Sequence, residues 1–132
     1  MNTMARWWRF NLVGAAGMVL QLALLALFNR LAPSHYLMGS AAALELTLLH
    51  NFVWHLRYTW REPSMHTALA KRLARFHLSN GVVSLVGNIV LMRLLVQDVH
   101  LPVLVSNGIA ILSCSVVNFY LGQHWTFETV HE

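Results

Sequence analysis

Ionisable and amide side chains that could do chemistry interrupt the long apolar runs of this chain at only a few places. Glu45 stands inside such a run, which continues to a basic and aromatic cluster around Arg57 and Trp60. A charged side chain at the centre of a lipid-spanning helix costs about 2.5–3.5 kcal/mol on insertion scales. We therefore expect Glu45 to face a bundle interior or a hydrated groove. There it is either a proton-coupling or substrate-contacting group, or a neutral acid that holds helices together.

Further polar residues recur at similar depth in the other apolar runs. Gln21, Asn88 and Ser113 each stand near the middle of a run, and Ser84 precedes Asn88 by one helical turn. Such a stripe either lines a path for a hydrophilic group or joins helices, because polar residues also mediate helix packing in lipid. The predicted intramembrane polar path consists of Gln21, Glu45, Asn51, Ser84, Asn88 and Asn118.

Basic residues gather at the ends of the apolar runs. An arginine fork can hold two phosphate oxygens, whereas lysine binds phosphate as a point charge. This cluster therefore predicts binding of an anionic lipid headgroup; the alternative is plain topological signalling and snorkelling. The predicted phosphate-binding residues are Arg9, Arg57, Arg61, Lys71, Arg72 and Arg75, with Trp60 and Trp125 as aromatic residues at the membrane interface.

Metal and enzyme chemistry find little support in the sequence. His50 and His55 are five residues apart and fall on different helix faces, and the single cysteine excludes an internal disulfide. The chain has no Gly-rich phosphate loop and no extramembrane segment long enough for a donor-substrate domain. We therefore expect no metal, no cofactor and no enzymatic activity.

The totals place the chain in a membrane. It has 132 residues, of which 57% are apolar and 11% charged, whereas soluble domains carry about 25% charged residues. Four apolar runs, at about 10–28, 36–56, 77–96 and 101–121, each approach the ~20 residues that a helix needs to cross hydrocarbon. The fold class is therefore predicted as an all-α membrane protein with four transmembrane helices.

The distribution of Lys and Arg predicts the orientation. All nine lie before the first run or between the second and third, except Arg30 and Arg93. By the positive-inside rule, both termini are then cytoplasmic. In the inner loop, apolar residues recur at helical spacing and basic residues occupy the other directions: Met65, Leu69, Leu73 and Phe76 against His66, Lys71, Arg72 and Arg75. This pattern predicts a short amphipathic helix at the cytoplasmic surface; the alternative is a solvated basic loop.

Two landmarks recur along the chain. Arg9-Phe10 returns as Arg75-Phe76 after 66 residues, and Asn51-Phe52 returns as Asn118-Phe119 after 67. We interpret this as duplication of a two-helix unit, with repeat 1 at about 9–60 and repeat 2 at about 75–127 in a single 1–132 domain. A copied unit with an even number of spans keeps its orientation, so the repeats should be parallel about an axis along the membrane normal.

These motifs, in this order and spacing, resemble the GtrA-like membrane protein family from about Trp8 to Phe127. The resemblance is carried by Arg9-Phe10-Asn11-Leu12-Val13-Gly14, Asn51-Phe52 with Arg57-Tyr58-Thr59-Trp60, Arg75-Phe76, and Asn118-Phe119 with Trp125-Thr126-Phe127. The second copy departs at Gln123, where the first has Leu56 and then Arg57, so the two halves are not expected to capture phosphate alike.

The resemblance implies translocation of a polyprenyl-phosphate-linked monosaccharide such as glucose across the bacterial inner membrane, for cell-surface polysaccharide or lipopolysaccharide modification. Undecaprenyl phosphate is the expected carrier type. The alternatives are a non-catalytic adaptor that anchors a partner glycosyltransferase, or a small proton-coupled exporter suggested by Glu45 alone. Four helices have little interior for a sugar, so we expect a homo-oligomer or a groove open to lipid. No nucleic-acid partner is expected.

Overall fold

The computed structural model describes residues 2–62 and 67–128, apart from the side chains of Tyr36 and Leu104. Within these residues every regular element is a helix and no strand occurs. The chain divides into two compact units, Met1–Met65 (unit 1) and His66–Glu132 (unit 2). One predicted repeat falls within each unit, and each unit is described by itself.

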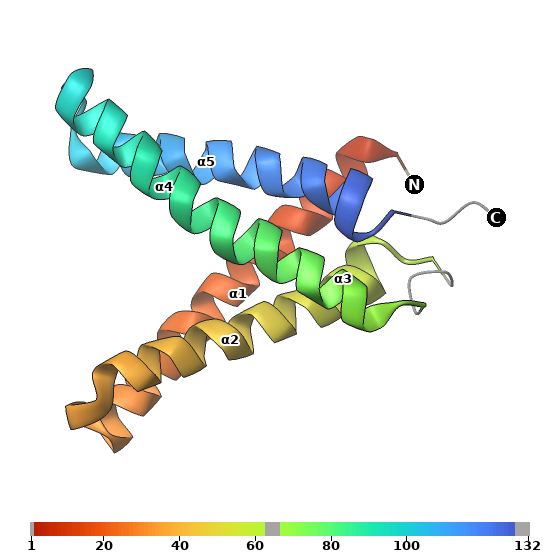
Figure 1. Ribbon diagram of the computed structural model, residues 1–132, viewed down its shortest axis with the longest axis horizontal. Helices are drawn as coiled ribbons and strands as arrows, with labels where there is room; N and C mark the ends of the chain where they lie inside the picture. The colour runs from red at the N-terminus through yellow and green to blue at the C-terminus, as the bar shows by residue number, and fades with distance from the viewer. Residues whose placement is uncertain (1, 63–66, 129–132) are drawn as a thin grey trace. The chain divides into compact units, whose positions relative to one another are not determined.

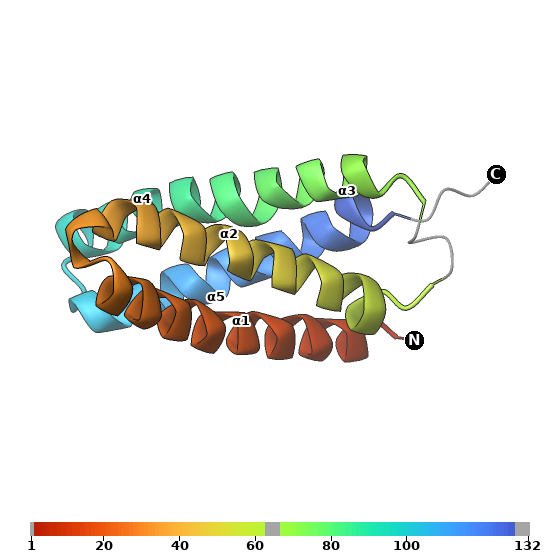
Figure 2. The ribbon, with the colours of Figure 1, turned by 90° about the horizontal axis from the view of Figure 1, so that it is seen from below.

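Unit 1 is an antiparallel helical hairpin (Figure 1). It comprises α1 (Thr3–Leu31), a 3-10 turn η1 (Pro33–His35), α2 (Tyr36–Trp54) and a π-helical turn η2 (His55–Thr59). The side chain of Asn2 caps α1 by accepting a hydrogen bond from the Ala5 amide at 2.8 Å, which satisfies one of the free N–H groups of a helix start. Viewed from below, α1 and α2 lie side by side (Figure 2).

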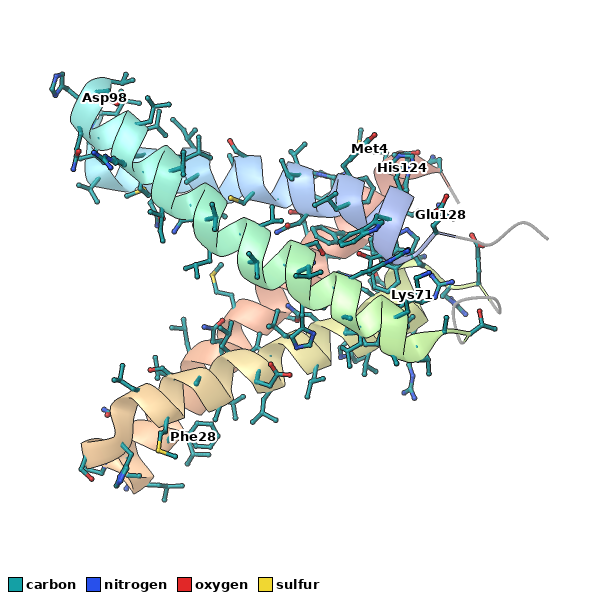
Figure 3. The ribbon with its side chains drawn as sticks, viewed as in Figure 1. Met4, Phe28, Lys71, Asp98, His124 and Glu128 are labelled. Atoms are coloured by element: carbon teal, nitrogen blue, oxygen red, sulfur yellow. The ribbon has the colours of Figure 1, made fainter. Side chains whose placement is uncertain are left out.

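Unit 2 is a second helical hairpin. Its first arm joins α3 (Leu69–Phe76), the π-helical η4 (His77–Val83), α4 (Ser84–Arg93) and the π-helical η5 (Leu94–Asp98). Its second arm is α5 (Val103–Leu121) followed by the π-helical η6 (Gly122–Thr126). Asp98 lies at the turn of this hairpin, whereas Lys71, His124 and Glu128 lie at the opposite end (Figure 3). Charged residues therefore mark both ends of the unit.

The predicted amphipathic helix is not a separate element. Its described part, α3, is the beginning of one 30-residue helix that runs from Leu69 to Asp98. Hydrogen bonding continues without a break because no proline or glycine interrupts the chain between Leu69 and Asn80. Met65 and His66, which the same prediction included, lie outside the described residues.

Three helices of the described chain are long and apolar enough to cross a membrane: Thr3–Leu31, Leu69–Asp98 and Val105–Thr126. In their most apolar stretches only 17%, 6% and 28% of the residues are buried, so most side chains face outward, as lipid contact requires. The 19-residue α2 is not among them. Its length of about 28 Å suffices, but Glu45, His50 and Asn51 lower its hydropathy. The fourth span therefore stays a prediction.

On the predicted duplication, the π-turn η4 would account for the different spacings of the two landmarks of the sequence. A π-turn closes on the fifth residue and therefore holds one residue more than an α-turn. Arg9 and Arg75 precede the α1 counterpart and η4, respectively, and are 66 residues apart. Gly17 follows the α1 counterpart, Ser84 follows η4, and these two residues are 67 apart. The duplication itself, and any axis relating the two copies, stay predictions.

Candidate functional site

Arg9 holds the end of the unit 1 hairpin together. Its Nη1 donates a hydrogen bond to the carbonyl oxygen of Tyr58 at 2.9 Å. Its guanidinium carbon also lies 4.7 Å from the centroid of the Tyr58 ring, a cation–π distance. Arg9 therefore satisfies a carbonyl of the π-turn η2, and at least one of its five N–H donors is committed to the fold.

Arg75 makes the same pair of contacts in unit 2. Its Nη1 donates to the Trp125 carbonyl oxygen at 2.7 Å, and its guanidinium carbon lies 5.3 Å from the Trp125 ring centroid. Trp125 occupies the position in η6 that Tyr58 occupies in η2. The recurring arginines thus have a structural role in both units, in addition to the phosphate contact that the sequence predicts for them.

Trp60 is a core residue of unit 1 and not the interface residue that its sequence position predicts, because only 1% of its surface is exposed. The Phe10 ring stacks on His55 at a centroid distance of 4.8 Å, and Trp60 meets Phe10 edge-on at 6.1 Å. The Trp60 amide donates to the His55 carbonyl oxygen five residues earlier at 2.8 Å, which closes the π-turn over these rings.

Arg72 is likewise buried, with 5% of its surface exposed. Its Nε donates to the Thr67 carbonyl oxygen at 3.0 Å and its Nη1 to the Thr126 carbonyl oxygen at 3.1 Å. These bonds join the start of α3 to the end of η6. Arg72 is therefore a structural residue, and its guanidinium is not presented to a ligand at the surface.

The remaining predicted phosphate-binding residues are accessible. Arg57 and Arg61 are exposed at the end of unit 1, and Lys71 is exposed at the start of α3 in unit 2. Arg6, by contrast, is neutralised by Glu62, whose Oε1 lies 2.8 Å from Arg6 Nη2. The basic set therefore separates into fold-stabilising and ligand-accessible members, which composition alone did not distinguish.

Unit 2 contains a polar cluster between α4 and α5. Asn118 Nδ2 donates to Ser84 Oγ, and Cys114 Sγ lies 3.9 Å from the Ser84 carbonyl oxygen. The buried oxygens Asn88 Oδ1 and Asn118 Oδ1 accept no hydrogen bond from any described residue. Three predicted path residues, Ser84, Asn88 and Asn118, are thus brought onto the two facing arms of one hairpin.

Unit 1 has a sparser polar contact at the corresponding level. Asn51 is half-buried, and its Oδ1 accepts a hydrogen bond from His50 Nδ1 at 3.0 Å. The Asn51 amide packs against Gly17, where an added Cβ would lie 2.6 Å from Nδ2. Gln21 is half-buried one turn further along α1. Gly17 therefore gives the Asn51 side chain the space that the neighbouring helix would otherwise fill.

We expect Gly17→Ala to destabilise unit 1, because its Cβ would overlap the Asn51 amide. Overpacking of this kind costs typically about 1–3 kcal/mol. Gly14→Ala is the matched control on the same helix, since a Cβ there meets nothing within 4 Å. Chemical denaturation of the purified chain in detergent would measure both, and equal stabilities for the two variants would refute the close packing.

Glu45 is exposed and does not point into the interior of the unit 1 hairpin. The expectation that it faces a bundle interior or a hydrated groove stays a prediction. Thr47, Asn51 and His55, spaced by four residues, turn toward the hairpin interior, and Glu45 lies about 200° around the helix from Thr47. Among residues 2–62 and 67–128, no group of three His, Cys, Asp or Glu side chains is placed to hold a metal ion.

The sequence did not indicate that His55, Thr59 and Thr126 are buried. His55 is buried, and its Nδ1 lies 3.0 Å from the Thr59 hydroxyl. In unit 2, Gly122 replaces the histidine, and the buried Thr126 Oγ1 has no hydrogen-bond partner in the described chain. The recurrence of Thr59-Trp60 as Thr126-Phe127 is visible in the sequence, but it does not by itself indicate that the two threonines are buried.

These long, apolar, outward-facing helices define a multi-pass membrane protein. The family model for the GtrA/DPMS transmembrane domain matches residues 9–127. The chain therefore belongs to the GtrA/DPMS transmembrane domain family, as its motifs predicted. A dolichol-phosphate mannosyltransferase from Pyrococcus furiosus is 28% identical over 121 residues, which are 92% of this chain and 33% of that protein. The chain thus spans about a third of the length of this curated relative.

Proposed function

We propose that this protein translocates a polyprenyl-phosphate-linked monosaccharide, such as glucose, across the bacterial inner membrane for modification of cell-surface polysaccharide. Its family and the name of its mannosyltransferase relative support a role with a polyprenyl-phosphate sugar. The protein would have four spans, cytoplasmic termini and no catalytic activity of its own. A homo-oligomer would enlarge the space available to the sugar.

The observation that carries this proposal is the pair of buried amide oxygens in unit 2. Asn88 Oδ1 and Asn118 Oδ1 have no hydrogen-bond donor in the described chain, and each asparagine is at least eight residues, or about 12 Å, from the ends of its apolar helix. An unsatisfied buried carbonyl in hydrocarbon is costly. A sugar presents several hydroxyl donors, so its passage would satisfy both oxygens transiently.

The accessible arginines would receive the phosphate group on the cytoplasmic side. Arg57 and Arg61 are exposed, whereas Arg72 is buried against two backbone carbonyls. Capture of the phosphate would thus depend on the exposed Arg57 and Arg61. Arg9 and Arg75 would contribute only the N–H groups that are not hydrogen-bonded to the carbonyl oxygens of the π-turns.

We expect Asn88→Leu to slow translocation about tenfold, because the loss of one hydrogen bond to the moving sugar raises the barrier by about 1.4 kcal/mol. The same change should leave stability unchanged or raise it, since it removes a buried acceptor without a partner. Reconstituted liposomes with labelled polyprenyl-phosphate-glucose would measure the rate. Val90→Leu, at an exposed position on α4, is the control. If Asn88→Leu translocated the lipid-linked sugar at the wild-type rate, the hypothesis of an intramembrane polar path would be refuted.

The second candidate is a non-catalytic membrane adaptor that localises a glycosyltransferase. It is favoured by one observation: the segment matched in the mannosyltransferase relative is 33% of that protein. An adaptor predicts that Glu45→Ala and Asn88→Leu are both tolerated, that the segment between the units is sensitive to substitution, and that a glycosyltransferase co-purifies with the chain. Loss of glycosylation in cells with either variant, together with loss of translocation in liposomes, would decide against it.

A further inference from the structure

Unit 1 carries an apolar groove that the polar path does not use. Its volume is ≈ 270 Å³, and it lies between one stripe of α1 and the end of α2. The groove opens outward, because Leu12 and Trp54 remain 58% and 49% exposed. The lining residues are Leu12, Val13, Ala16, His50, Trp54 and Tyr58.

The groove has a mainly apolar lining that includes flat aromatic rings. Trp54 and Tyr58 present aromatic surface, and the His50 ring lies 6.2 Å from the Trp54 ring. His50 Nδ1 is already hydrogen-bonded to Asn51 Oδ1, which leaves Nε2 as the polar atom of this ring that a ligand could contact. From the level of Arg9 to Ala16, α1 rises about 10 Å, which is a third of a ~30 Å hydrocarbon layer.

One end of the groove is cationic. Arg9 lies over the ring of Tyr58, a groove residue, and exposed Arg57 directly precedes Tyr58. Among the described residues, the ion pair that the structure shows in this unit is Arg6 with Glu62, so no carboxylate neutralises Arg9. An apolar channel that ends at an uncompensated guanidinium suits an amphiphile with one chain and an anionic head.

We propose that this groove binds the first isoprene units of a polyprenyl phosphate, with its phosphate at Arg9. The proposal rests on the proposed function for the choice of an isoprenoid. A single methyl-branched chain with planar double bonds fits against Trp54 and Tyr58, and the rest of the tail stays in lipid. The site lies wholly within unit 1 and is distinct from the polar cluster of unit 2.

The test uses the full chain in phosphatidylcholine nanodiscs with a farnesyl monophosphate analogue that carries a benzophenone in its chain. We expect photolabelling, mapped by mass spectrometry, within residues 12–16 and 54–58. Ala16→Phe should weaken binding about tenfold, because it displaces about two carbon groups of the ligand from the groove. Ala15→Phe is the matched control: Ala15 is also exposed on α1 but does not line the groove.

Each outcome decides a separate point. Labelling that maps to residues 69–128, or equal binding by Ala16→Phe and Ala15→Phe, would overturn the groove while leaving the proposed function intact. Equal competition by two-chain phosphatidylglycerol would overturn the isoprenoid assignment. A chain that neither binds nor is labelled by the analogue would overturn the groove, whereas the proposed function is decided separately by the translocation assay in liposomes. The labelling map of the unsubstituted chain keeps the test valid if Ala16→Phe fails to fold.

Discussion

Arg72→Ala is expected to lower the free energy of unfolding by about 3 kcal/mol, because each hydrogen bond from a charged group contributes about 1.5–3 kcal/mol. The substitution removes both the bond to the Thr67 carbonyl and the bond to the Thr126 carbonyl. The second of these carbonyls is in the buried part of the hairpin end and would be left without that donor. Denaturant titration in detergent micelles, followed by circular dichroism, measures the change.

Lys71→Ala provides the matched control for Arg72→Ala. It removes one positive charge from the adjacent residue of α3, but the Lys71 side chain is exposed. Surface substitutions usually change stability by no more than about 0.5 kcal/mol. Arg72→Lys should fall between the two, because an ammonium on a flexible stem cannot match a planar fork that reaches two carbonyls at once. A phosphate-binding role for Arg72 would instead give three equally stable proteins with different lipid affinities.

Trp60→Ala is expected to cost about 3–5 kcal/mol, the range for deleting a large buried aromatic side chain. The indole is 1% exposed and contacts the rings of Phe10 and His55, at 6.1 Å and 5.5 Å between centroids. Removing it leaves a cavity beneath the π-turn η2. Thermal unfolding in detergent, monitored by the loss of helical ellipticity, would show the effect as a large drop in the transition temperature.

Trp60→Phe separates the need for an aromatic ring from the need for indole. In unit 2 the corresponding position holds Phe127, whose ring lies 6.2 Å from Phe76. A phenyl ring therefore serves the same packing role there, and we expect Trp60→Phe to cost less than about 1.5 kcal/mol. If both variants were as stable as the unsubstituted protein, Trp60 would belong at the membrane interface, as its sequence position had indicated.

The helices were predictable because the hydropathy that determines membrane insertion is evaluated along the sequence, without knowledge of the tertiary structure. Runs of about 20 apolar residues imply helices whatever their neighbours are, since lipid cannot satisfy backbone polar groups. The end of a helix is less predictable. The basic, amphipathic stretch at Leu69–Phe76 resembles a surface helix in composition, but it continues directly into α4. Nothing in residue composition distinguishes an end from a wide turn such as η4.

The site was only partly predictable because side-chain direction depends on local backbone geometry. Ser84, Asn88 and Asn118 were expected on one path, and they do lie on facing arms of the same hairpin. Trp60 was placed among lipid headgroups by its position in the sequence, whereas its ring is buried within unit 1. Similarly, the number of basic residues did not reveal that the Arg72 guanidinium is hydrogen-bonded to two main-chain carbonyl oxygens.

The π-turn η4 has a consequence for how the two hairpins tolerate differences in length. One additional residue in a regular α-helix would rotate everything beyond it by about 100° and move each contact face away from its partner. On the predicted duplication, the one additional residue of unit 2 would fall within the π-helical His77–Val83, whose wider turn holds one residue more than an α-turn. The contact faces before and after η4 would then keep their partners in spite of the difference in length between the two copies.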